Sequence, residues 1–251
     1  DKACHFCYLD LDGEELNLET FKEALDSNKF NRVTLSGGEP FARKDIWNLI
    51  EEIEKRDLKV NIITNGTSLD EQVSKRLAAI DGLKLYVSYH RPNPSLRDKM
   101  FTAHNKGIST HAHVVLESPA YRQIERIFED ISFVDSSMIL YPTNLGSKRR
   151  LTVLNDEGNV AAMRTPAVRM FTADEWLPMI EHFLETAKGY NFEVYYEPAF
   201  ARRDTPDIED IICPAGDDPF IHVDGKAYPC CLLVDSEHGK EGTFAPLSFD
   251  Y

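Results

Sequence analysis

Cysteines gather at the two ends of this 251-residue sequence. Two lie near its start, Cys4 and Cys7, and three near its end, Cys213, Cys230 and Cys231. Structural disulfides are not expected to cluster in this way, and a chain of this length has no need of them. Cysteine thiolates are ligands for zinc and for iron–sulfur clusters. The spacing therefore predicts metal or cluster sites in a reducing cytoplasm, and the cysteines alone leave zinc and iron–sulfur both open.

One strand end carries a further chemical signal. The stretch "LSGGEP" (35–40) places Gly37, Gly38 and Glu39 directly after a predicted strand. Paired glycines let a ligand approach the backbone closely. A carboxylate such as that of Glu39 receives an ammonium group through charge-assisted hydrogen bonds. These residues are candidates for a ligand site, because function collects at the carboxyl ends of parallel strands.

Hydrophobic periodicity predicts the elements that position these residues. Short apolar segments alternate with amphipathic ones, which is typical of βαβ units and a parallel sheet in an α/β fold. The predicted strands are 32–36, 58–64, 83–89, 110–117, 137–142 and 192–198, and the predicted helices are 18–28, 44–56, 69–80, 94–104, 119–130 and 173–188. Helix starts are expected near Asn17, Ser68, Pro94, Ser95 and Pro119.

Two segments interrupt that alternation. Residues 143–172 read as a long loop or hairpin with a turn at 155–159, and residues 219–234 read as a short β-rich unit. We expect a domain boundary near residue 200, with a core over 1–200 and a smaller cysteine-containing extension over 201–251.

The composition argues against several classes of partner. The net charge is −14, whereas nucleic-acid binding needs a basic surface. No apolar run approaches the length that spans a bilayer. We therefore expect a cytoplasmic protein that binds neither nucleic acid nor membrane.

Together, "CHFCY" (4–8) and "LSGGEP" resemble the radical S-adenosylmethionine (SAM) superfamily, whose loop reads Cys-x3-Cys-x-aromatic-Cys. Cys4, Phe6 and Cys7 match its last two cysteines and its aromatic residue. Counting back three residues places the first cysteine immediately before Asp1, and the strand that normally precedes this loop is also expected upstream. The resemblance implies a partial (β/α)6 TIM-like barrel that carries a [4Fe–4S] cluster. By the same resemblance, this cluster cleaves SAM to a 5′-deoxyadenosyl radical, which abstracts hydrogen from substrate.

The resemblance also implies roles for single residues around SAM. Phe6 would lie against adenine, and Ser88, which ends a predicted strand, would contact the ribose. Gly37, Gly38 and Glu39 would bind the methionine amino group, and Thr64 and Asn65 would line the cavity.

Other polar residues are candidates to face the substrate. The stretch "SYHRP" (88–92) departs from the Ser-x-Asp-Gly of many relatives, which makes His90 and Arg91 candidates. His111 and His113 alternate in one strand and therefore share a face, and Glu117 stands at its end. A basic stretch (Lys148, Arg149, Arg150, Arg164 and Arg169) is a candidate to hold an anionic group at the barrel mouth. The competing interpretations are core or surface histidines and a solvated charge run.

The segment "CPAGDDPFIHVDGKAYPCC" (213–231) resembles the opening half of the SPASM or twitch extension, which carries auxiliary iron–sulfur clusters. A hairpin with Gly225 at its turn would bring Cys213 and Cys230 together. Cys231 is either a third ligand or a buried neighbour, since adjacent strand residues point oppositely.

Three functions remain open at this level. The first is a radical SAM maturase acting on a peptide or protein, supplied with electrons by a ferredoxin or flavodoxin. The second is a radical SAM enzyme acting on a small metabolite in cofactor or natural-product biosynthesis. The third is a non-catalytic zinc or iron–sulfur protein.

Overall fold

The computed structural model describes residues 15–26, 30–116, 122–140, 152–154, 160–163, 171–196, 220–223, 225 and 227–228. These residues fall into two compact units. The first unit holds a large sheet and its covering helices, and the second holds one helix and two short hairpins. The predicted division at residue 200 stays a prediction.

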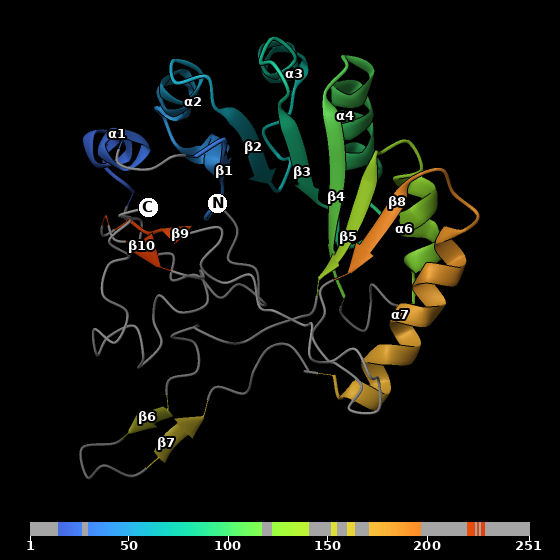
Figure 1. The fold of residues 1–251 in the computed structure, drawn as a ribbon. Coiled ribbons are helices and arrows are strands. Elements are labelled where there is room, and N and C mark those ends of the chain that lie inside the picture. The colour runs from blue at the N-terminus through green and yellow to red at the C-terminus, as the bar shows by residue number, and fades with distance from the viewer. Residues whose placement is uncertain are drawn as a thin grey trace, which may run out of the picture. The chain divides into compact units, whose positions relative to one another are not determined.

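The first unit is built on a six-stranded sheet in which every pairing is parallel. Its strands follow chain order: β1 (Arg32–Leu35), β2 (Lys59–Thr64), β3 (Lys84–Ser88), β4 (Ser109–Val115), β5 (Ser136–Leu140) and β8 (Glu193–Tyr196). Figure 1 shows this consecutive order along the sheet. The predicted α/β fold and its six strands are confirmed, with ends that differ from the predicted ones by up to two residues.

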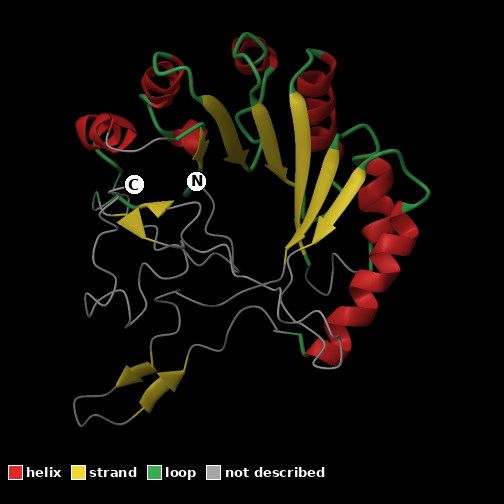
Figure 2. Cartoon of the chain, in the orientation of Figure 1, coloured by secondary structure: helices red, strands yellow, loops and turns green. Residues whose placement is uncertain are grey.

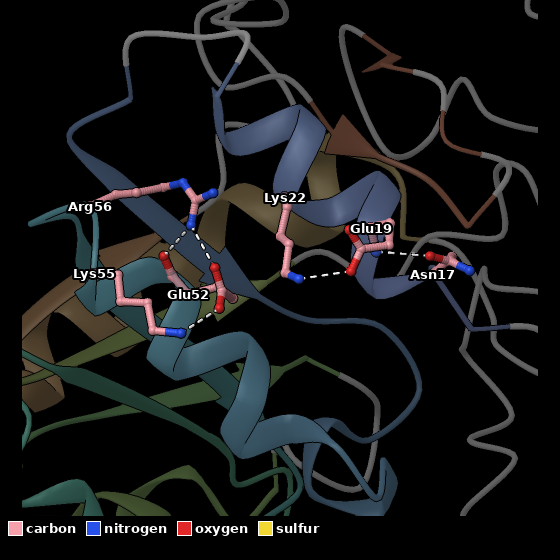
Figure 3. Close-up of polar contacts among 6 residues, drawn as sticks. All are labelled: Asn17, Glu19, Lys22, Glu52, Lys55 and Arg56. Atoms are coloured by element: carbon pink, nitrogen blue, oxygen red, sulfur yellow. Dashed lines mark hydrogen bonds and ion pairs between the residues drawn. The ribbon is translucent and has the colours of Figure 1, made fainter.

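Helices cover one face of this sheet (Figures 1 and 2). They are α2 (Ile46–Glu54), α3 (Glu71–Leu77), α4 (Pro94–Asn105), α6 (Ile124–Asp130) and α7 (Ala173–Ala187), with a 3-10 turn, η1, at Pro40–Ala42. On the surface of α2, Glu52 pairs with Lys55 at 2.6 Å and with Arg56 at 2.9 Å (Figure 3). The Lys55 side chain is exposed, so its pair contributes little to stability, whereas Arg56 and Glu52 are partly buried.

Side-chain caps decide where the helices begin. Asp70 accepts a hydrogen bond from the Val73 N–H at 2.8 Å, so α3 begins at Glu71. The prediction that Ser68 starts this helix at residue 69 is therefore wrong, because Asp70 supplies the capping oxygen. Asn93 caps α4 in the same way, from the position before Pro94. Thr172 and Glu175 form a capping box at α7.

The sheet register sorts the strand residues onto two faces, because registered neighbours in a parallel sheet point the same way. The face toward the helices carries fully buried apolar side chains: Val60, Ile62, Leu85, Val87, Ala112, Val114 and Ile139. The opposite face, called the inner face below, is mixed. It carries polar and aromatic side chains (Asn61, Tyr86, Ser88, His111, His113 and Ser136) among others (Ile63, Lys84, Val115, Met138 and Leu140). The hydrophobic core thus lies between sheet and helices, and the polar groups of the strands gather on the inner face.

The second unit contains helix α1 (Leu18–Asp26), which Asn17 caps by accepting from the Glu19 N–H at 2.8 Å (Figure 3). Two antiparallel pairs belong to the same unit. They are β6 (Thr152–Leu154) with β7 (Val160–Met163), and β9 (Phe220–Ile221) with β10 (Ala227–Tyr228). Gly225 lies between β9 and β10 with φ +79°, so the predicted turn is confirmed. Among the described residues, no helix has the length and apolar character needed to cross a membrane.

Candidate functional site

Several predicted site residues lie outside the described residues. They are Cys4, Phe6 and Cys7 near the start, Glu117 after β4, the basic stretch with Arg149, and Cys213, Cys230 and Cys231 near the end. The remaining candidates belong to the first unit and lie at the carboxyl ends or on the inner face of its sheet.

Glu39 is the centre of a hydrogen-bonded network at the carboxyl ends of β1 and β2. Its carboxylate accepts from the Thr64 hydroxyl at 2.7 Å, from the Asn65 N–H at 2.7 Å and from the Phe41 N–H at 3.2 Å. Glu39 is only 8% exposed and Thr64 only 2%. Burying a carboxylate is costly unless it is hydrogen-bonded, and these three donors meet that requirement. The network ties the loop after β1 to the end of β2.

The turn after β2 continues this network. The Thr64 hydroxyl accepts from the Gly66 N–H at 3.0 Å, and Asn65 Oδ1 accepts from the Thr67 N–H at 2.8 Å. Gly66 has φ +70°, and a Cβ there would overlap Leu96 Cδ1. The family resemblance implied that Glu39 binds the methionine amino group and that Thr64 and Asn65 line the cavity, but it did not imply the direct bonds between Glu39 and these two residues.

Gly37 presents open space beside the backbone. Its φ is +134°, and a Cβ built on it would meet no atom within 4 Å. Gly37 and Gly38 are both exposed, whereas the neighbouring Glu39 is buried. A carboxylate has about four acceptor positions, so Glu39 keeps room for one further donor beside its three described partners. This remaining acceptor position and this open backbone fit the ammonium end of an amino acid.

Ser88 is the last residue of β3, and His90 follows the strand. Ser88 is half-buried and belongs to the inner face. His90 accepts a hydrogen bond from the Val115 N–H at 2.9 Å through Nδ1, which ties its ring to β4. Arg91 is exposed beside it. The structure therefore gives His90 a positioning contact, while the predicted substrate-facing role of His90 and Arg91 stays a prediction.

His111 and His113 share the inner face and both contact Tyr86. The Tyr86 ring lies 4.7 Å from the His111 ring at 20°, and 5.1 Å from the His113 ring at 40°. These centroid distances lie in the range of favourable ring pairs. Tyr86, which the sequence analysis did not select, therefore orients both imidazoles, and only the β3–β4 register reveals it.

The two histidines differ in their hydrogen bonds. The Ser109 hydroxyl donates to Asp135 Oδ2 at 2.8 Å, so its oxygen accepts from His111 Nε2 at 3.0 Å. His111 Nδ1 then accepts from the Ser136 hydroxyl at 2.8 Å. Both nitrogens of His111 are thus hydrogen-bonded, and this pattern corresponds to the neutral tautomer with the proton on Nε2. For His113, no partner of either ring nitrogen exists within the described part of the chain.

Burial keeps both rings neutral near pH 7. Burial lowers the pKa of His113 to about 4, and the neighbouring His111 lowers it further in the same direction. Burial also lowers the pKa of His111, against an opposing effect of Asp135 and with a smaller lowering from Lys84. Burial raises the pKa of the Tyr86 phenol. The inner face therefore offers neutral hydrogen-bonding groups, in contrast to the carboxylate at the sheet edge.

One further inner-face group is incompletely paired. Asn61 is 7% exposed, and its amide nitrogen reaches Thr34 Oγ1 at the long distance of 3.4 Å. Its Oδ1 atom is buried and has no hydrogen-bond partner among the described residues. Buried polar atoms are nearly always paired, so Asn61 marks the inner face as a place where polar partners are expected.

Comparison with known sequences identifies the family. Residues 1–130 match the radical SAM superfamily, which is more than half of the chain. The match covers the "CHFCY" segment, the Glu39 network and the β3–β4 inner face. The chain belongs to the radical SAM superfamily.

Two curated relatives are similar over shorter segments. A mycofactocin maturase, MftC of Mycolicibacterium smegmatis, is 29% identical over 90 residues, which are 35% of this chain and 23% of that protein. A PqqA peptide cyclase of Granulibacter bethesdensis is 36% identical over 91 residues, which are 33% of this chain and 24% of that protein. The matched segments thus span about a quarter of these relatives.

Solved structures share the fold. Streptococcus suis SuiB bound to its precursor peptide SuiA has a TM-score of 0.71 at 17% identity, over 93% of this chain and 57% of SuiB. The enzyme anSMEcpe with bound AdoMet and the Cp18Cys peptide has a TM-score of 0.62 at 15% identity, over 99% of this chain and 80% of that one. These likenesses support the partial α/β barrel predicted from the sequence.

Proposed function

We propose that this protein is a radical SAM enzyme that modifies a peptide or protein substrate. Membership of the radical SAM superfamily supports the class of chemistry in this proposal. The peptide substrate is supported by the two similar sequences, which are a maturase and a peptide cyclase, and by fold neighbours that hold peptides. Because the matched segments are a minor part of those relatives, the activity and the substrate class are our inference.

The family implies a [4Fe–4S] cluster and SAM. Cys4 and Cys7, with a cysteine before Asp1, would hold the cluster, and Phe6 would lie against adenine. When bound, these groups supply an electron and a reactive adenosyl carbon for hydrogen abstraction, chemistry that protein side chains do not provide.

The described residues position and orient the nucleotide. Glu39 offers its remaining acceptor position to the methionine ammonium group, and Gly37 leaves the backbone accessible beside it. Thr64 and Asn65 fix the direction of the Glu39 carboxylate before any ligand binds. Such preorganisation lowers the cost of binding. Ser88, the last residue of β3, would contact the ribose.

Further parts of the sequence-based hypothesis belong to the same proposal. Cys213 and Cys230, with Cys231 as a third candidate, would hold an auxiliary cluster in a SPASM- or twitch-like extension. A ferredoxin or flavodoxin would deliver the electron in a reducing cytoplasm. His90, Arg91, His111, His113, Glu117 and Arg149 are the candidates for contact with substrate.

The test is anaerobic reconstitution of the full-length protein, followed by iron and sulfide analysis and assay of 5′-deoxyadenosine with dithionite. We expect 5′-deoxyadenosine, and about eight irons per chain if both sites hold [4Fe–4S] clusters or about four if only the first does. The variants Cys4→Ala and Cys7→Ala should lose the SAM-cleaving cluster, while Cys231→Ala is the control that keeps it. Bound zinc with no SAM cleavage would overturn the proposal in favour of a structural metal protein.

A further inference from the structure

The amino end of the inner face carries two cations that form no ion pair with the described residues. These are Arg32 on β1 and Lys84 on β3, and between them on β2 stands Lys59, whose ammonium group is paired with Asp81. Arg32 is exposed, whereas Lys84 is half-buried. Burying a charge is costly unless it is paired, so Lys84 stands out as a cation suited to an anionic ligand.

A buried amide lies directly beside Lys84. Asn61 and Lys84 are register partners on β2 and β3, and adjacent strands of a sheet are about 4.8 Å apart. Asn61 is 7% exposed, its Nδ2 reaches Thr34 Oγ1 at 3.4 Å, and its Oδ1 has no partner among the described residues. Turning the amide over would exchange its donor and its acceptor and would still leave one polar atom unpaired. Since buried polar atoms are nearly always paired, this amide points to a hydrogen-bonding ligand.

The acids at the same end of the sheet are already paired. Asp135, just before β5, accepts from the Ser109 hydroxyl at 2.8 Å and from the Thr110 N–H at 2.9 Å. Glu193, the first residue of β8, accepts from the Tyr195 hydroxyl. The sheet order places these paired acids toward β5 and β8, whereas the unpaired cations belong to β1 and β3. In the part of the chain that the structure describes, no carboxylate neutralises Arg32 or Lys84.

Both cations act on the aromatic pair in the middle of the inner face. Burial raises the pKa of Tyr86, and Arg32 opposes this rise. Burial lowers the pKa of His111, and Lys84 adds to this lowering. Lys84 and Ser109 also border a cavity of about 210 Å³ at the amino ends of β3 and β4. The two cations therefore lie close to the centre of the inner face, and there is space for a ligand beside Lys84.

The chemistry of this cluster selects a carboxylate that belongs to a peptide. Ammonium and guanidinium groups bind carboxylates through charge-assisted hydrogen bonds. A side-chain amide pairs with a peptide group, because each of them offers both an N–H donor and a carbonyl acceptor. An acidic residue within a peptide carries both of these groups a few bonds apart, whereas a simple inorganic anion would leave the amide carbonyl unpaired.

We propose that Arg32, Asn61 and Lys84 form a subsite for an acidic residue of the peptide substrate. The two cations hold its carboxylate, and the Asn61 amide pairs with a neighbouring peptide group. This inference rests on the proposed function, since it takes a peptide as the substrate, and it adds the class of residue that the substrate carries. None of the three residues is among the substrate-facing candidates selected from the sequence.

Two peptides that differ in one charge test the subsite: acetyl-Ala-Glu-Ala-amide and acetyl-Ala-Gln-Ala-amide. Their dissociation constants are measured by ligand-observed NMR titration on the anaerobically reconstituted full-length protein, in about 0.15 M salt to screen exposed charges. We expect the wild type to bind the glutamate peptide about tenfold more tightly, the effect of one charge-assisted hydrogen bond.

Lysine variants locate the group that recognises the charge. Lys84→Met keeps the apolar stem and removes the ammonium group, so it should bring the ratio of the two affinities close to one. Lys84→Gln decides the result if the methionine variant is unstable. Lys59→Met is the matched control on the neighbouring strand and should keep the ratio, because the Lys59 ammonium group is already bound to Asp81.

Asn61→Leu separates a ligand site from a structural role. Because Asn61 Oδ1 has no described partner, the apolar side chain should leave the urea unfolding midpoint unchanged or raise it. The same variant should weaken both peptides by an equal factor of about five. A lower midpoint with unchanged peptide binding would give Asn61 a structural role and remove it from the subsite.

Three results would overturn the acidic subsite. They are equal or undetectable binding of the two peptides by the wild type, a ratio that Lys84→Met leaves unchanged, and an equal loss of the ratio in Lys59→Met. Cleavage of SAM by the same preparation would then still support the proposed function, whereas a preparation that cleaves no SAM would count against that function whatever the peptides do.

Discussion

The carboxyl edge of β1 and β2 and the inner face of β3 and β4 use polar residues in opposite ways. At the edge, Glu39, Thr64 and Asn65 bind one another, so their geometry is set within the protein. On the inner face, Ser88 and His113 are held in place by backbone and ring contacts while their polar atoms have no partner among the described residues. The first region is preorganised by hydrogen bonds and the second by packing.

Because of this difference, substitutions in the two regions should have different effects: one set should mainly lower the stability of the fold, and the other should mainly weaken ligand binding. Removing a group from the closed network leaves buried donors unpaired, which costs folding energy. Removing an open group costs little folding energy, but it takes a contact from the ligand. The predictions below test that separation.

The largest effect is expected for Glu39→Ala. The change leaves the Thr64 hydroxyl and two backbone N–H groups without their acceptor, and we expect a loss of about 3 kcal/mol in the free energy of unfolding. Urea unfolding measures this loss. Glu39→Gln keeps an acceptor oxygen and should lose less. A wild-type unfolding midpoint for Glu39→Ala would show that the network adds nothing to stability.

Two glycines give a matched pair with the next largest effect. Gly66→Ala places a Cβ against Leu96 and Val87 at positive φ, and we expect about 2 kcal/mol of destabilisation from overlap and backbone strain. Gly37→Ala meets no atom within 4 Å and should cost about 1 kcal/mol through its backbone conformation alone. Thermal unfolding of both variants, with and without S-adenosylhomocysteine, measures the two losses of stability. Equal losses in the two variants would contradict the distinction between a packed and an open glycine.

Acid should lower the free energy of unfolding through the half-buried imidazole of His113. Its pKa of about 4 in the folded protein is below the ordinary value of 6.5, so the unfolded chain binds more protons between these values. The free energy of unfolding should therefore fall as the pH drops through this window, by about 2 kcal/mol for this group, and the contribution vanishes above pH 7. Urea unfolding at pH 7 and pH 4.5 measures the fall. His113→Phe should show a smaller fall than the wild type, and an identical pH dependence would count against burial of the ring.

The smallest effects are expected for His111→Phe and His113→Phe at pH 7. The phenylalanine at position 111 keeps the contact with Tyr86 but leaves the Ser109 and Ser136 hydroxyls without the imidazole, which should cost about 1 kcal/mol at pH 7. His113→Phe should cost less at the same pH, because no described partner loses a bond. Chemical unfolding of both variants side by side gives the comparison, and the reverse order of stabilities would show that the assigned roles are exchanged.

Much of the fold followed from local pattern. The alternation of apolar strands and amphipathic helices predicted the parallel sheet, and the strand-end rule predicted that Gly37, Gly38 and Glu39 lie at its carboxyl edge. The family resemblance added Thr64 and Asn65 as residues that line the cavity. Helix starts were less certain, because Asp70 and Ser68 are both good caps and only the chain geometry chooses between them. The cysteine sites were predicted from spacing and family resemblance, and those residues lie outside the described ones.

The sequence by itself determined which residues share a face and which stand at strand ends, because side chains alternate with a period of two along a strand. It could not determine which polar atoms are paired, since a partner comes from a neighbouring strand whose register is set by the whole sheet. Only the tertiary structure placed Ser109 and Ser136 at the two nitrogens of His111 and left His113 beside Ser88. The two histidines are two positions apart in the sequence, and their long-range contacts make them different.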